Sequence, residues 1–481
     1  MRGMSDRTTV RGHVPGSDRG SDGARDHGAC GRTDRWGGSA ATAGARILRG
    51  FALAAAALVP VGDALRADDW PQWMGPQRDN VWREEGLLDS FPADGPKVLW
   101  RTPIAGGYAG PAVAGGRVFV TDYVTDADVK VANFDRKTST GTERVLCLDE
   151  ATGTILWKRE YPVTYTIAYP AGPRCTPTVD GDRVYTLGAE GNLLCLAVAD
   201  GREIWARDLK ADYRCKAALW GYASHPLVDG DRLVCVVGTD VAHAVAFDKL
   251  TGKELWRTGT APEQGYSPPT IIESAGRRML VFMKPDGIYA ADPATGAKLW
   301  ESPYNADNGS IIMAPVQVGD YLYVGGFQEK NLLLKLAADG NAPEVVWRNK
   351  AKHGISAVNV QPFGADGHIY GFHEKGDLRV VAIPGGNVVW QGGGPLAGRQ
   401  QGSGSAFMVR QGSRLWMFAE TGDLVIAKLS PQGYEELGRT HLLEPTNNAF
   451  GRKVVWCGPA FADRSIFVRN DAEIIRVSLA R

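Results

Sequence analysis

The stretch Thr176-Pro177-Thr178-Val179-Asp180-Gly181-Asp182-Arg183-Val184-Tyr185, continuing to Ile204-Trp205, recurs as His225-Pro226-Leu227-Val228-Asp229-Gly230-Asp231-Arg232-Leu233-Val234, continuing to Leu255-Trp256. Alternating Val, Leu and Tyr across Asp-Gly turns is typical of β-hairpins, so each copy is interpreted as four short strands. Units of this kind end at Trp157, Trp205, Trp256, Trp300, Trp347 and Trp390, at intervals of 48, 51, 44, 47 and 43 residues. A period of roughly 40 to 50 residues indicates a propeller or a solenoid, and four strands per unit predict a propeller blade.

Looser copies complete the set of repeats. Residues 110–157, 267–300, 313–347, 356–390 and 404–437 bring the number of units to seven, and an eighth, at residues 456–477, has no closing Trp strand before Arg481. The segment Lys97-Val98-Leu99-Trp100 matches the blade-closing strands, although no inner strands precede it. The sequence therefore predicts an all-β, eight-bladed β-propeller of four-stranded antiparallel blades, in which strand 97–100 completes the last blade and closes the ring.

The length of the chain favours one repeat domain, and its balanced charge argues against binding to nucleic acid or to an anionic membrane. One closed ring of about 390 residues fits better than three domains of about 150 residues, because repeat proteins depart from the usual domain size. We expect an N-terminal segment at 68–95 and the propeller at 96–481. Lys and Arg number 54, as do Asp and Glu, so no global field attracts nucleic acid or an anionic membrane.

The N-terminal region is expected to be a targeting segment. Residues 1–45 are rich in Gly, Arg, Asp, Ser and Thr, which predicts disorder or a misassigned translation start. Residues 46–67 combine a charged flank, the apolar run 51–59 and small residues before Asp68, as a secretory signal peptide does. Export to the periplasm or the cell exterior is the prediction, with no transmembrane segment in the mature chain, and a membrane-anchored N-terminus is the alternative.

The spacing of the cysteines does not match the motifs for covalent haem or for zinc. Cys147 and Cys195 occupy equivalent strand positions and are predicted to be core residues. Cys175 and Cys215 lie in loops, where an oxidising compartment could pair them, but their spacing leaves this open. No Cys-x-x-Cys-His motif and no zinc-type Cys/His spacing occurs in the sequence.

Three units, at residues 147–157, 246–256 and 290–300, share the pattern Asp, Thr-Gly and a closing Leu-Trp. In this they resemble the repeat of the pyrroloquinoline quinone (PQQ) enzyme-like propellers. That superfamily includes quinoprotein dehydrogenases, the outer-membrane assembly lipoprotein of the BamB type and secreted propellers of unassigned function. The opening residues 70–76, Trp-Pro-Gln-Trp-Met-Gly-Pro, resemble the last group most closely.

The repeated Asp and Trp are interpreted as structural. An Asp before Thr-Gly caps a turn through its side chain, and Gly accepts a positive φ there. The Trp supplies a large packing surface between blades, and its indole N–H needs a fixed acceptor. The resemblance implies the same blade-docking role.

Functional residues are expected in the loops that lead from the last strand of one blade to the first strand of the next, because propellers gather these loops at one mouth of the channel. A funnel with stacking surfaces there would suit a planar cofactor, a sugar or a peptide, and ordinary loop packing is the alternative. No catalytic residue and no metal ligand is assigned. The candidate ligand-binding residues are Tyr108, Arg174, Arg214, Trp220, Tyr222, His225, Tyr266, His353, Arg452 and Trp456.

Three functions are compatible with this sequence. The leading hypothesis is a non-catalytic, monomeric scaffold that binds a protein or another envelope component. The second is a divergent dehydrogenase of alcohols or sugars that uses PQQ and Ca²⁺; its relatives hold PQQ against a disulfide of adjacent cysteines, a pair that this chain lacks. The third is a carbohydrate-binding propeller. A lipid anchor of the assembly-lipoprotein kind is not expected, because Ala67 is followed by Asp68-Asp69-Trp70 with no cysteine nearby.

Overall fold

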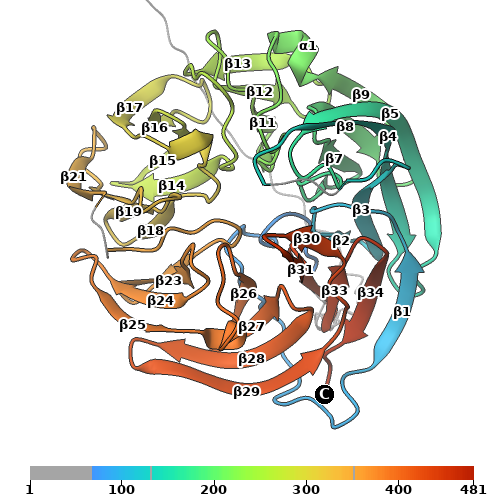
Figure 1. Ribbon diagram of the computed structural model, residues 1–481. Coiled ribbons are helices and arrows are strands. Elements are labelled where there is room, and N and C mark those ends of the chain that lie inside the picture. Colours follow the sequence, from blue (N-terminus) through green and yellow to red (C-terminus); the bar gives the residue numbers. More distant parts are fainter. Residues whose placement is uncertain (1–67, 130–132, 350–352) are drawn as a thin grey trace, which may run out of the picture. The chain divides into compact units, whose positions relative to one another are not determined.

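Eight four-stranded antiparallel sheets follow one another around a ring, as the computed structural model of the chain shows (Figure 1). It describes residues 68–129, 133–349 and 353–481, so the predicted extension 1–45 and signal peptide 46–67 lie outside the described residues. Within the described residues no helix is long and apolar enough to cross a membrane. The prediction of an all-β, eight-bladed propeller is confirmed.

Each blade uses its strands in sequence order from the ring axis outward. The first four blades are β2 (Ala112–Ala114), β3 (Arg117–Val124), β4 (Lys137–Asp149) and β5 (Ile155–Ile167); β6 (Thr178–Asp180), β7 (Arg183–Leu187), β8 (Asn192–Ala197) and β9 (Glu203–Asp208); β10 (Leu227–Asp229), β11 (Arg232–Val236), β12 (Ala244–Asp248) and β13 (Glu254–Thr258); and β14 (Thr270–Ser274), β15 (Arg277–Lys284), β16 (Gly287–Ala291) and β17 (Lys298–Pro303).

The next three blades are β18 (Val316–Val318), β19 (Tyr321–Val324), β20 (Leu332–Lys335) and β21 (Glu344–Arg348); β22 (Phe363–Ala365), β23 (His368–Phe372), β24 (Leu378–Ala382) and β25 (Val388–Gly392); and β26 (Ala406–Gln411), β27 (Arg414–Ala419), β28 (Asp423–Ser430) and β29 (Gly433–His441). A hairpin of β30 (Asn447–Ala449) and β31 (Arg452–Val454) precedes the last blade. Helical structure in the described chain is limited to the five-residue α1 (Leu209–Tyr213) and two single turns, η1 (Asp307–Gly309) and η2 (Gly394–Leu396).

The eighth blade joins the two ends of the propeller. Its inner strands are β32 (Ala460–Ala462), β33 (Ser465–Arg469) and β34 (Glu473–Ser478), and its outer strand is β1 (Val98–Pro103). β1 pairs antiparallel with β34, from Val98 opposite Val477 to Pro103 opposite Glu473. The predicted closure of the ring by the N-terminal strand is confirmed, since the last blade is incomplete without it.

Neighbouring blades dock through the repeated Trp and the Gly of the next blade's turn. The indole N–H of Trp157 donates to Val198 O at 2.9 Å, and that of Trp205 donates to Lys249 O at 3.1 Å. Gly201 has a φ of +71°, and a Cβ atom there would lie 2.4 Å from the ring of Trp157. The predicted structural role of the repeated Trp is confirmed by these contacts, which also explain why Gly must follow Thr or its equivalent in each turn.

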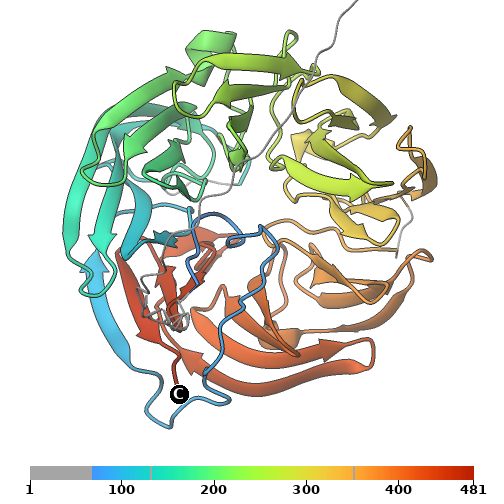
Figure 2. The same ribbon diagram turned by 180° about the vertical axis from the view of Figure 1, so that it is seen from behind.

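The N-terminal segment 68–96 packs against the propeller before β1 begins. It crosses the centre of the ring on the face seen in Figure 2. Trp82 in this segment is 1% exposed and packs against Trp416 and Phe461, with ring centroids 5.6 and 4.8 Å away. The hydrogen-bond partners of the whole N-terminal segment come from five blades. They are Val113 in β2, Val179 in β6, Pro226 before β10, Arg410 in β26 and Leu479 after β34. The segment thus ties together both sides of the ring.

A buried histidine between two blades makes the stability of the fold depend on pH. His243 is fully buried, its Nδ1 lies 3.0 Å from Tyr289 Oη, and burial lowers its pKa from 6.5 to about 4. The group is neutral in the fold, so its contribution is complete above pH 6.5 and is lost as the pH falls towards 4, by about 3 kcal/mol over that range. We expect His243→Gln to flatten the fall in unfolding free energy between pH 6.5 and 4 in urea titrations. The matched variant His368→Gln, at the β22–β23 turn, should retain the wild-type slope; an unchanged slope in His243→Gln would contradict the assignment.

Candidate functional site

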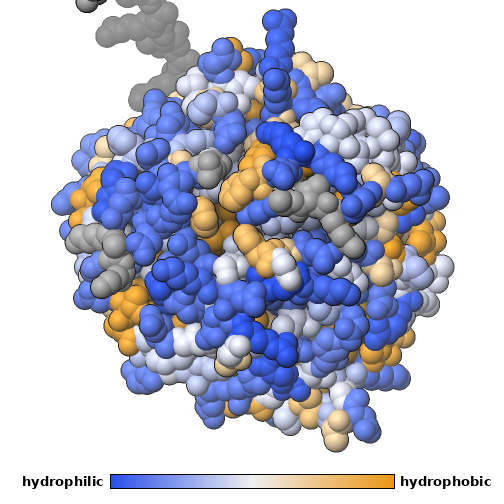
Figure 3. All heavy atoms as spheres, viewed as in Figure 1, coloured by the Kyte–Doolittle hydropathy of each residue, from blue (hydrophilic) through white to orange (hydrophobic). Residues whose placement is uncertain are grey.

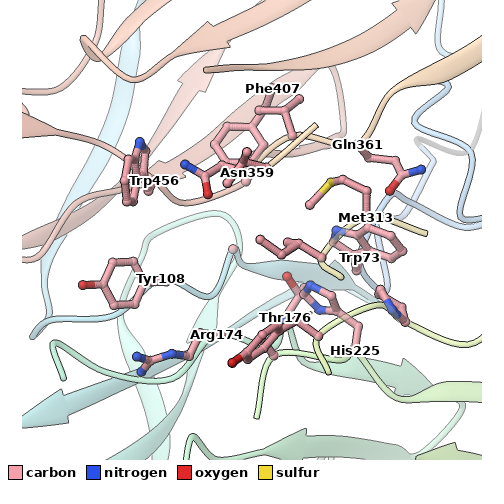
Figure 4. A pocket seen from close by; sticks show the side chains of 18 of the residues that line it. Trp73, Tyr108, Arg174, Thr176, His225, Met313, Asn359, Gln361, Phe407 and Trp456 are labelled. Atoms are coloured by element: carbon pink, nitrogen blue, oxygen red, sulfur yellow. Dashed lines mark hydrogen bonds between the residues drawn. The ribbon is translucent and has the colours of Figure 1, made fainter. Parts of the chain in front are cut away.

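A cavity of about 260 Å³ lies on the axis of the propeller. Its wall takes a residue at or just before the innermost strand of every blade, which places it at the point where the eight blades converge. These residues are Pro111, Thr176, His225, Pro268, Met313, Gln361, Phe407 and Pro459. Figure 4 shows side chains from several blades around one open space, and in Figure 3 apolar residues gather around a hollow at the centre of the face.

One end of the cavity is walled by the N-terminal segment. Trp73 stacks on His225 with ring centroids 4.8 Å apart and planes 7° apart, and the guanidinium of Arg78 lies 5.2 Å from the Trp73 ring centroid. The backbone N–H of Thr176 donates to His225 Nδ1 at 3.1 Å. Burial and the charge of Arg78 hold the pKa of His225 well below its usual range. His225 is therefore neutral and packs in this wall of the cavity, and its Nδ1 already accepts a hydrogen bond.

The opposite end is a rim of aromatic side chains. Trp220 packs between Phe134 and Tyr266, at centroid distances of 5.8 and 5.2 Å. In the same rim, Tyr169 packs edge-on against both Tyr108 and Trp456, with ring centroids 6.4 and 6.0 Å apart. These aromatic pairs have the edge-on and tilted geometry that aromatic rings prefer. We call the cavity together with this aromatic rim the funnel.

Arg174 organises the loop that carries the rim. Its Nε donates to Trp220 O at 2.9 Å, its Nη2 donates to Ala168 O and Tyr169 O at 2.9 and 2.6 Å, and its Nη1 donates to Gly172 O. The guanidinium also lies 5.1 Å from the ring centroid of Tyr108. Because nearly all of its N–H groups bond backbone carbonyls, Arg174 positions the rim more than it offers donors to a ligand.

A buried ion pair supports the rim from the other side. Arg452 Nε and Nη2 donate to the two carboxylate oxygens of Glu420 at 2.7 and 3.0 Å, and the indole N–H of Trp456 donates to Glu420 Oε2 at 3.1 Å. Glu420 is only 4% exposed, so it needs these partners. The pair fixes the orientation of Trp456 at the funnel.

The structure brings together six of the ten predicted site residues. Tyr108, Arg174, Trp220, His225, Tyr266 and Trp456 line the funnel. The other four lie off its wall, which differs from their predicted position. Arg214 is exposed and ends α1 with a φ of +53°, and Tyr222 is 1% exposed in the hydrophobic core between the second and third blades. The ring centroids of His353 and Trp347 lie 6.3 Å apart, and Arg452 is hydrogen-bonded to Glu420 behind the rim.

Several lining residues were not predicted. Trp73 and Met74 come from the N-terminal segment, and Phe134 comes from the long β3–β4 connection. Met313 and Phe407, in contrast, occupy the repeat position that precedes or begins the innermost strand, as Thr176 and His225 do. The repeat position therefore predicts Met313 and Phe407 as lining residues, whereas the aromatic and polar character of the loops does not.

The six described cysteines are free thiols. Cys147 and Cys195 are completely buried, which confirms their predicted place in the core. Cys175 Sγ lies 3.7 Å from Tyr222 O, and Cys215 Sγ lies 3.2 Å from Tyr222 Oη. The pairing of Cys175 with Cys215 that the sequence left open is therefore not formed in this structure.

The funnel does not have the residues that PQQ and Ca²⁺ chemistry needs. Ca²⁺ takes several oxygen ligands, usually including carboxylates, and alcohol oxidation needs a base that reaches the substrate hydroxyl. Among the described residues that line the funnel there is no Asp and no Glu, and its one imidazole is stacked and hydrogen-bonded. In the described parts of the chain, no three His, Cys, Asp or Glu side chains are grouped as a metal site would require. Most of the described lining is apolar or aromatic, with amide and hydroxyl side chains among it.

Comparisons with known proteins point to two kinds of propeller. The family model described as "Outer membrane protein assembly factor BamB" matches residues 141–390 and 284–433. The outer membrane protein assembly factor BamB of Shewanella oneidensis is 24% identical over 312 residues, which are 63% of this chain and 68% of that protein. A quinohemoprotein alcohol dehydrogenase of Pseudomonas putida is 26% identical over 134 residues, 26% of this chain and 18% of that enzyme.

The fold itself is shared with the solved structure of quinohemoprotein alcohol dehydrogenase ADHIIG from Pseudomonas putida. The two superpose with a TM-score of 0.50 at 12% identity, over 86% of this chain and 80% of that one. This likeness concerns the fold alone. The family model, in contrast, spans more than half of the chain, and so the chain belongs to the family described as outer membrane protein assembly factor BamB, whose PQQ-like repeats build its propeller.

Proposed function

We propose that this protein is an exported, non-catalytic scaffold of the cell envelope that holds a segment of another protein in its funnel. The observation that carries this proposal is the composition of the funnel. Its described lining is mostly aromatic and apolar, with a minority of amide and hydroxyl side chains such as Asn133, Asn359 and Ser310, with Arg174 as its single Arg or Lys and with no carboxylate. The membership of this chain in the family supports an assembly role, because the family model and the relative from Shewanella oneidensis are both described as outer membrane protein assembly factor BamB.

The size and polarity of the cavity favour protein side chains over a cofactor. Sites for cofactors and drug-sized ligands occupy about 300–1,000 Å³ and contain a few convergent polar groups, and this cavity, with about 260 Å³, lies just below the lower end of that range. The amide of Gln361 is already used, because it accepts from Ala314 N and donates to Ala314 O, both at 2.9 Å. One or two apolar side chains of a partner would fill the space, with the rim residues packing around them.

The alternatives from the sequence have less support at this site. A dehydrogenase would need the oxygen ligands and the base that the described lining lacks. A sugar site would need an exposed aromatic platform, and Tyr222, one of the aromatic residues predicted for the site, is buried in the core. The scaffold is the function that the geometry supports best.

The test is site-specific photo-crosslinking in the native envelope. A crosslinking residue in place of Phe450, which is 46% exposed at the rim, should give one or a few discrete protein adducts. The same residue in place of Leu250, which is 49% exposed at the β12–β13 turn, should not. Filling the cavity by Ala223→Trp should abolish the Phe450 adducts, whereas Ala211→Trp on the exposed side of α1 should leave them. Equal adduct patterns at both positions, or adducts that survive Ala223→Trp, would contradict the proposal.

A further inference from the structure

A second groove lies between the outer parts of the sixth and seventh blades. It has a volume of about 510 Å³ and shares no described lining residue with the funnel. Its lining comes from β25, from η2 with the residues on either side of it, and from β28 and β29. β25 and β29 are the outer strands of their blades and lie next to each other at the rim of the ring (Figure 1). Sites for small ligands occupy about 300–1,000 Å³, so this groove has the size of a binding site.

The groove is open because the seventh blade lacks the turn that covers the closing Trp elsewhere. In five blade contacts, a Cβ atom on the Gly of the next blade's turn would lie 2.4–2.8 Å from the Trp ring. Strand pairing in the first blade ends at Leu148 opposite Ile155, whereas in the seventh it continues past the equivalent bulge to Ser430 opposite Gly433. A Cβ atom on Gly433 would lie 3.8 Å from Trp390 Nε1. Trp390, the closing Trp of the sixth blade, therefore has no turn packed tightly against its ring.

Trp390 and Tyr434 together form an aromatic surface in this groove. Their ring centroids lie 6.4 Å apart and their planes differ by 27°. Both side chains are half-buried and both line the groove. Within the described chain the indole N–H of Trp390 has no hydrogen-bond partner, whereas those of Trp157 and Trp205 donate to carbonyls of the next blade. Two such side chains supply apolar area with polar tips, and the C–H faces of sugar rings pack on surfaces of this kind.

Carboxylates held by hydrogen bonds stand beside the aromatic surface. Arg439 donates from Nη1 to Asp423 Oδ2 at 3.0 Å, and from Nε and Nη2 to the two oxygens of Glu436 at 2.9 and 2.8 Å. Asp423 and Glu436 each accept three hydrogen bonds in all. A carboxylate can accept about four, so each has capacity for one more. The side chains are 17% and 31% exposed, respectively, and a ligand in the groove can therefore reach them.

Arg399 supplies free donors in the same groove. It is exposed, it lines the groove, and its guanidinium has no hydrogen-bond or ion-pair partner among the described residues. Arg399 and Arg439 balance the charges of Asp423 and Glu436, so the described lining carries no net charge at neutral pH. An anion would meet the two carboxylates, and a cation would meet the two guanidinium groups. A hydroxyl group both donates and accepts, so an uncharged ligand rich in hydroxyls matches this set best.

We propose that this groove binds a neutral glycan. A sugar ring packs on Trp390 and Tyr434, and the hydroxyl groups of the glycan form hydrogen bonds with Arg399, Asp423 and Glu436. The inference does not rest on the proposed function, because the groove and the funnel share no described lining residue. It gives the propeller a second binding activity, for a different class of ligand and at a different place on the ring.

The test is calorimetry on the full chain with four neutral trisaccharides: maltotriose, cellotriose, xylotriose and triacetylchitotriose. We expect at least one of them to bind with a Kd below about 1 mM. Trigalacturonate, which carries carboxylates, is the acidic counterpart. It should bind about tenfold more weakly than the best neutral trisaccharide, because like charges brought together at Asp423 and Glu436 are unfavourable.

Arg399→Ala locates the binding. The side chain is exposed and without a partner in the described chain, so the variant should keep the melting temperature of the wild type. It should weaken the best trisaccharide about tenfold, because hydrogen bonds to a charged group are lost. The matched control is Arg202→Ala, at the β8–β9 turn, where an exposed Arg likewise has no side-chain partner in the described chain. This control should leave the affinity unchanged.

Trp390→Ala should abolish measurable binding, and Trp390→Phe, which restores an aromatic ring, should recover part of it. Trp390 also packs against the core of its blade, so the melting temperatures of both variants are compared with that of the wild type. If Trp390→Ala does not fold, Arg399→Ala and Trp390→Phe decide the question.

Three results would overturn the inference. The first is no binding of any neutral trisaccharide at up to about 10 mM, where a site of the expected affinity is well occupied. The second is tighter binding of trigalacturonate than of every neutral trisaccharide. The third is an equal effect of Arg399→Ala and Arg202→Ala, which would place the sugar elsewhere on the protein. None of these results bears on the funnel, which the Phe450 crosslinks test separately.

Discussion

Removal of β1 is expected to abolish the stable propeller. A chain that lacks residues 1–103 loses the outer strand of the eighth blade, which leaves the edge of β34 unpaired. It also loses Trp100, whose indole N–H donates to Glu150 O of the first blade at 2.8 Å and whose ring packs against Phe467. Loss of a buried Trp alone costs about 3–5 kcal/mol, and each lost ladder hydrogen bond costs about 0.5–1.5 kcal/mol. The total reaches the 5–15 kcal/mol by which folded domains are stable. We therefore expect aggregation and a non-cooperative thermal transition.

The matched control is a chain that lacks residues 1–96. It also loses Trp70, Trp82 and Leu87 of the N-terminal segment but keeps β1, so the difference between the two chains isolates the closing strand. This longer chain should still unfold cooperatively, at a lower temperature than the full chain. Circular dichroism melting and gel filtration would decide the matter. Equal melting temperatures for the two truncated chains would mean that closure by β1 does not hold the ring together.

Gly201→Ala is expected to destabilise the contact between the first and second blades strongly. An L-residue at a φ of +71° costs about 1–2 kcal/mol. The added Cβ would also lie 2.4 Å from the Trp157 ring, and forcing extra atoms into a packed contact costs about 1–3 kcal/mol. Since the Trp ring cannot move without leaving its acceptor Val198 O, we expect a loss of about 2–5 kcal/mol in unfolding free energy.

Gly181→Ala provides the comparison for this substitution. Gly181 has a similar φ of +59°, but a Cβ there would meet nothing within 4 Å. Only the conformational cost of about 1–2 kcal/mol should therefore appear in its urea unfolding curve. If Gly181→Ala and Gly201→Ala destabilise the protein equally, the contact between the Trp and the next blade's Gly contributes little to blade docking.

The funnel shows where reasoning from sequence succeeds and where it stops. The loops between blades could be located because the repeats mark where each blade ends, and six of the ten residues chosen from those loops do line the funnel. Aromatic and basic residues in these loops, such as Tyr222 and Arg452, are candidates for the site. The residue type alone, however, does not determine whether a side chain lies at the axis or between two blades. The repeat does not place Trp73 or Phe134, since Trp73 precedes the first unit and Phe134 lies in the long β3–β4 connection within it.

The sequence by itself determined the blade count, the strand order and the closure of the ring. These are local properties, because alternating apolar residues and Asp-Gly turns act within a few residues, and a repeated local pattern leaves few ways to bury its apolar faces. Only the tertiary structure decided the chemistry of the axis. There, residues from eight blades and the N-terminal segment meet, and burial, stacking and hydrogen bonds between distant residues decide which groups are occupied. The stacking of Trp73 on His225, which are 152 positions apart in the chain, is visible only at that level.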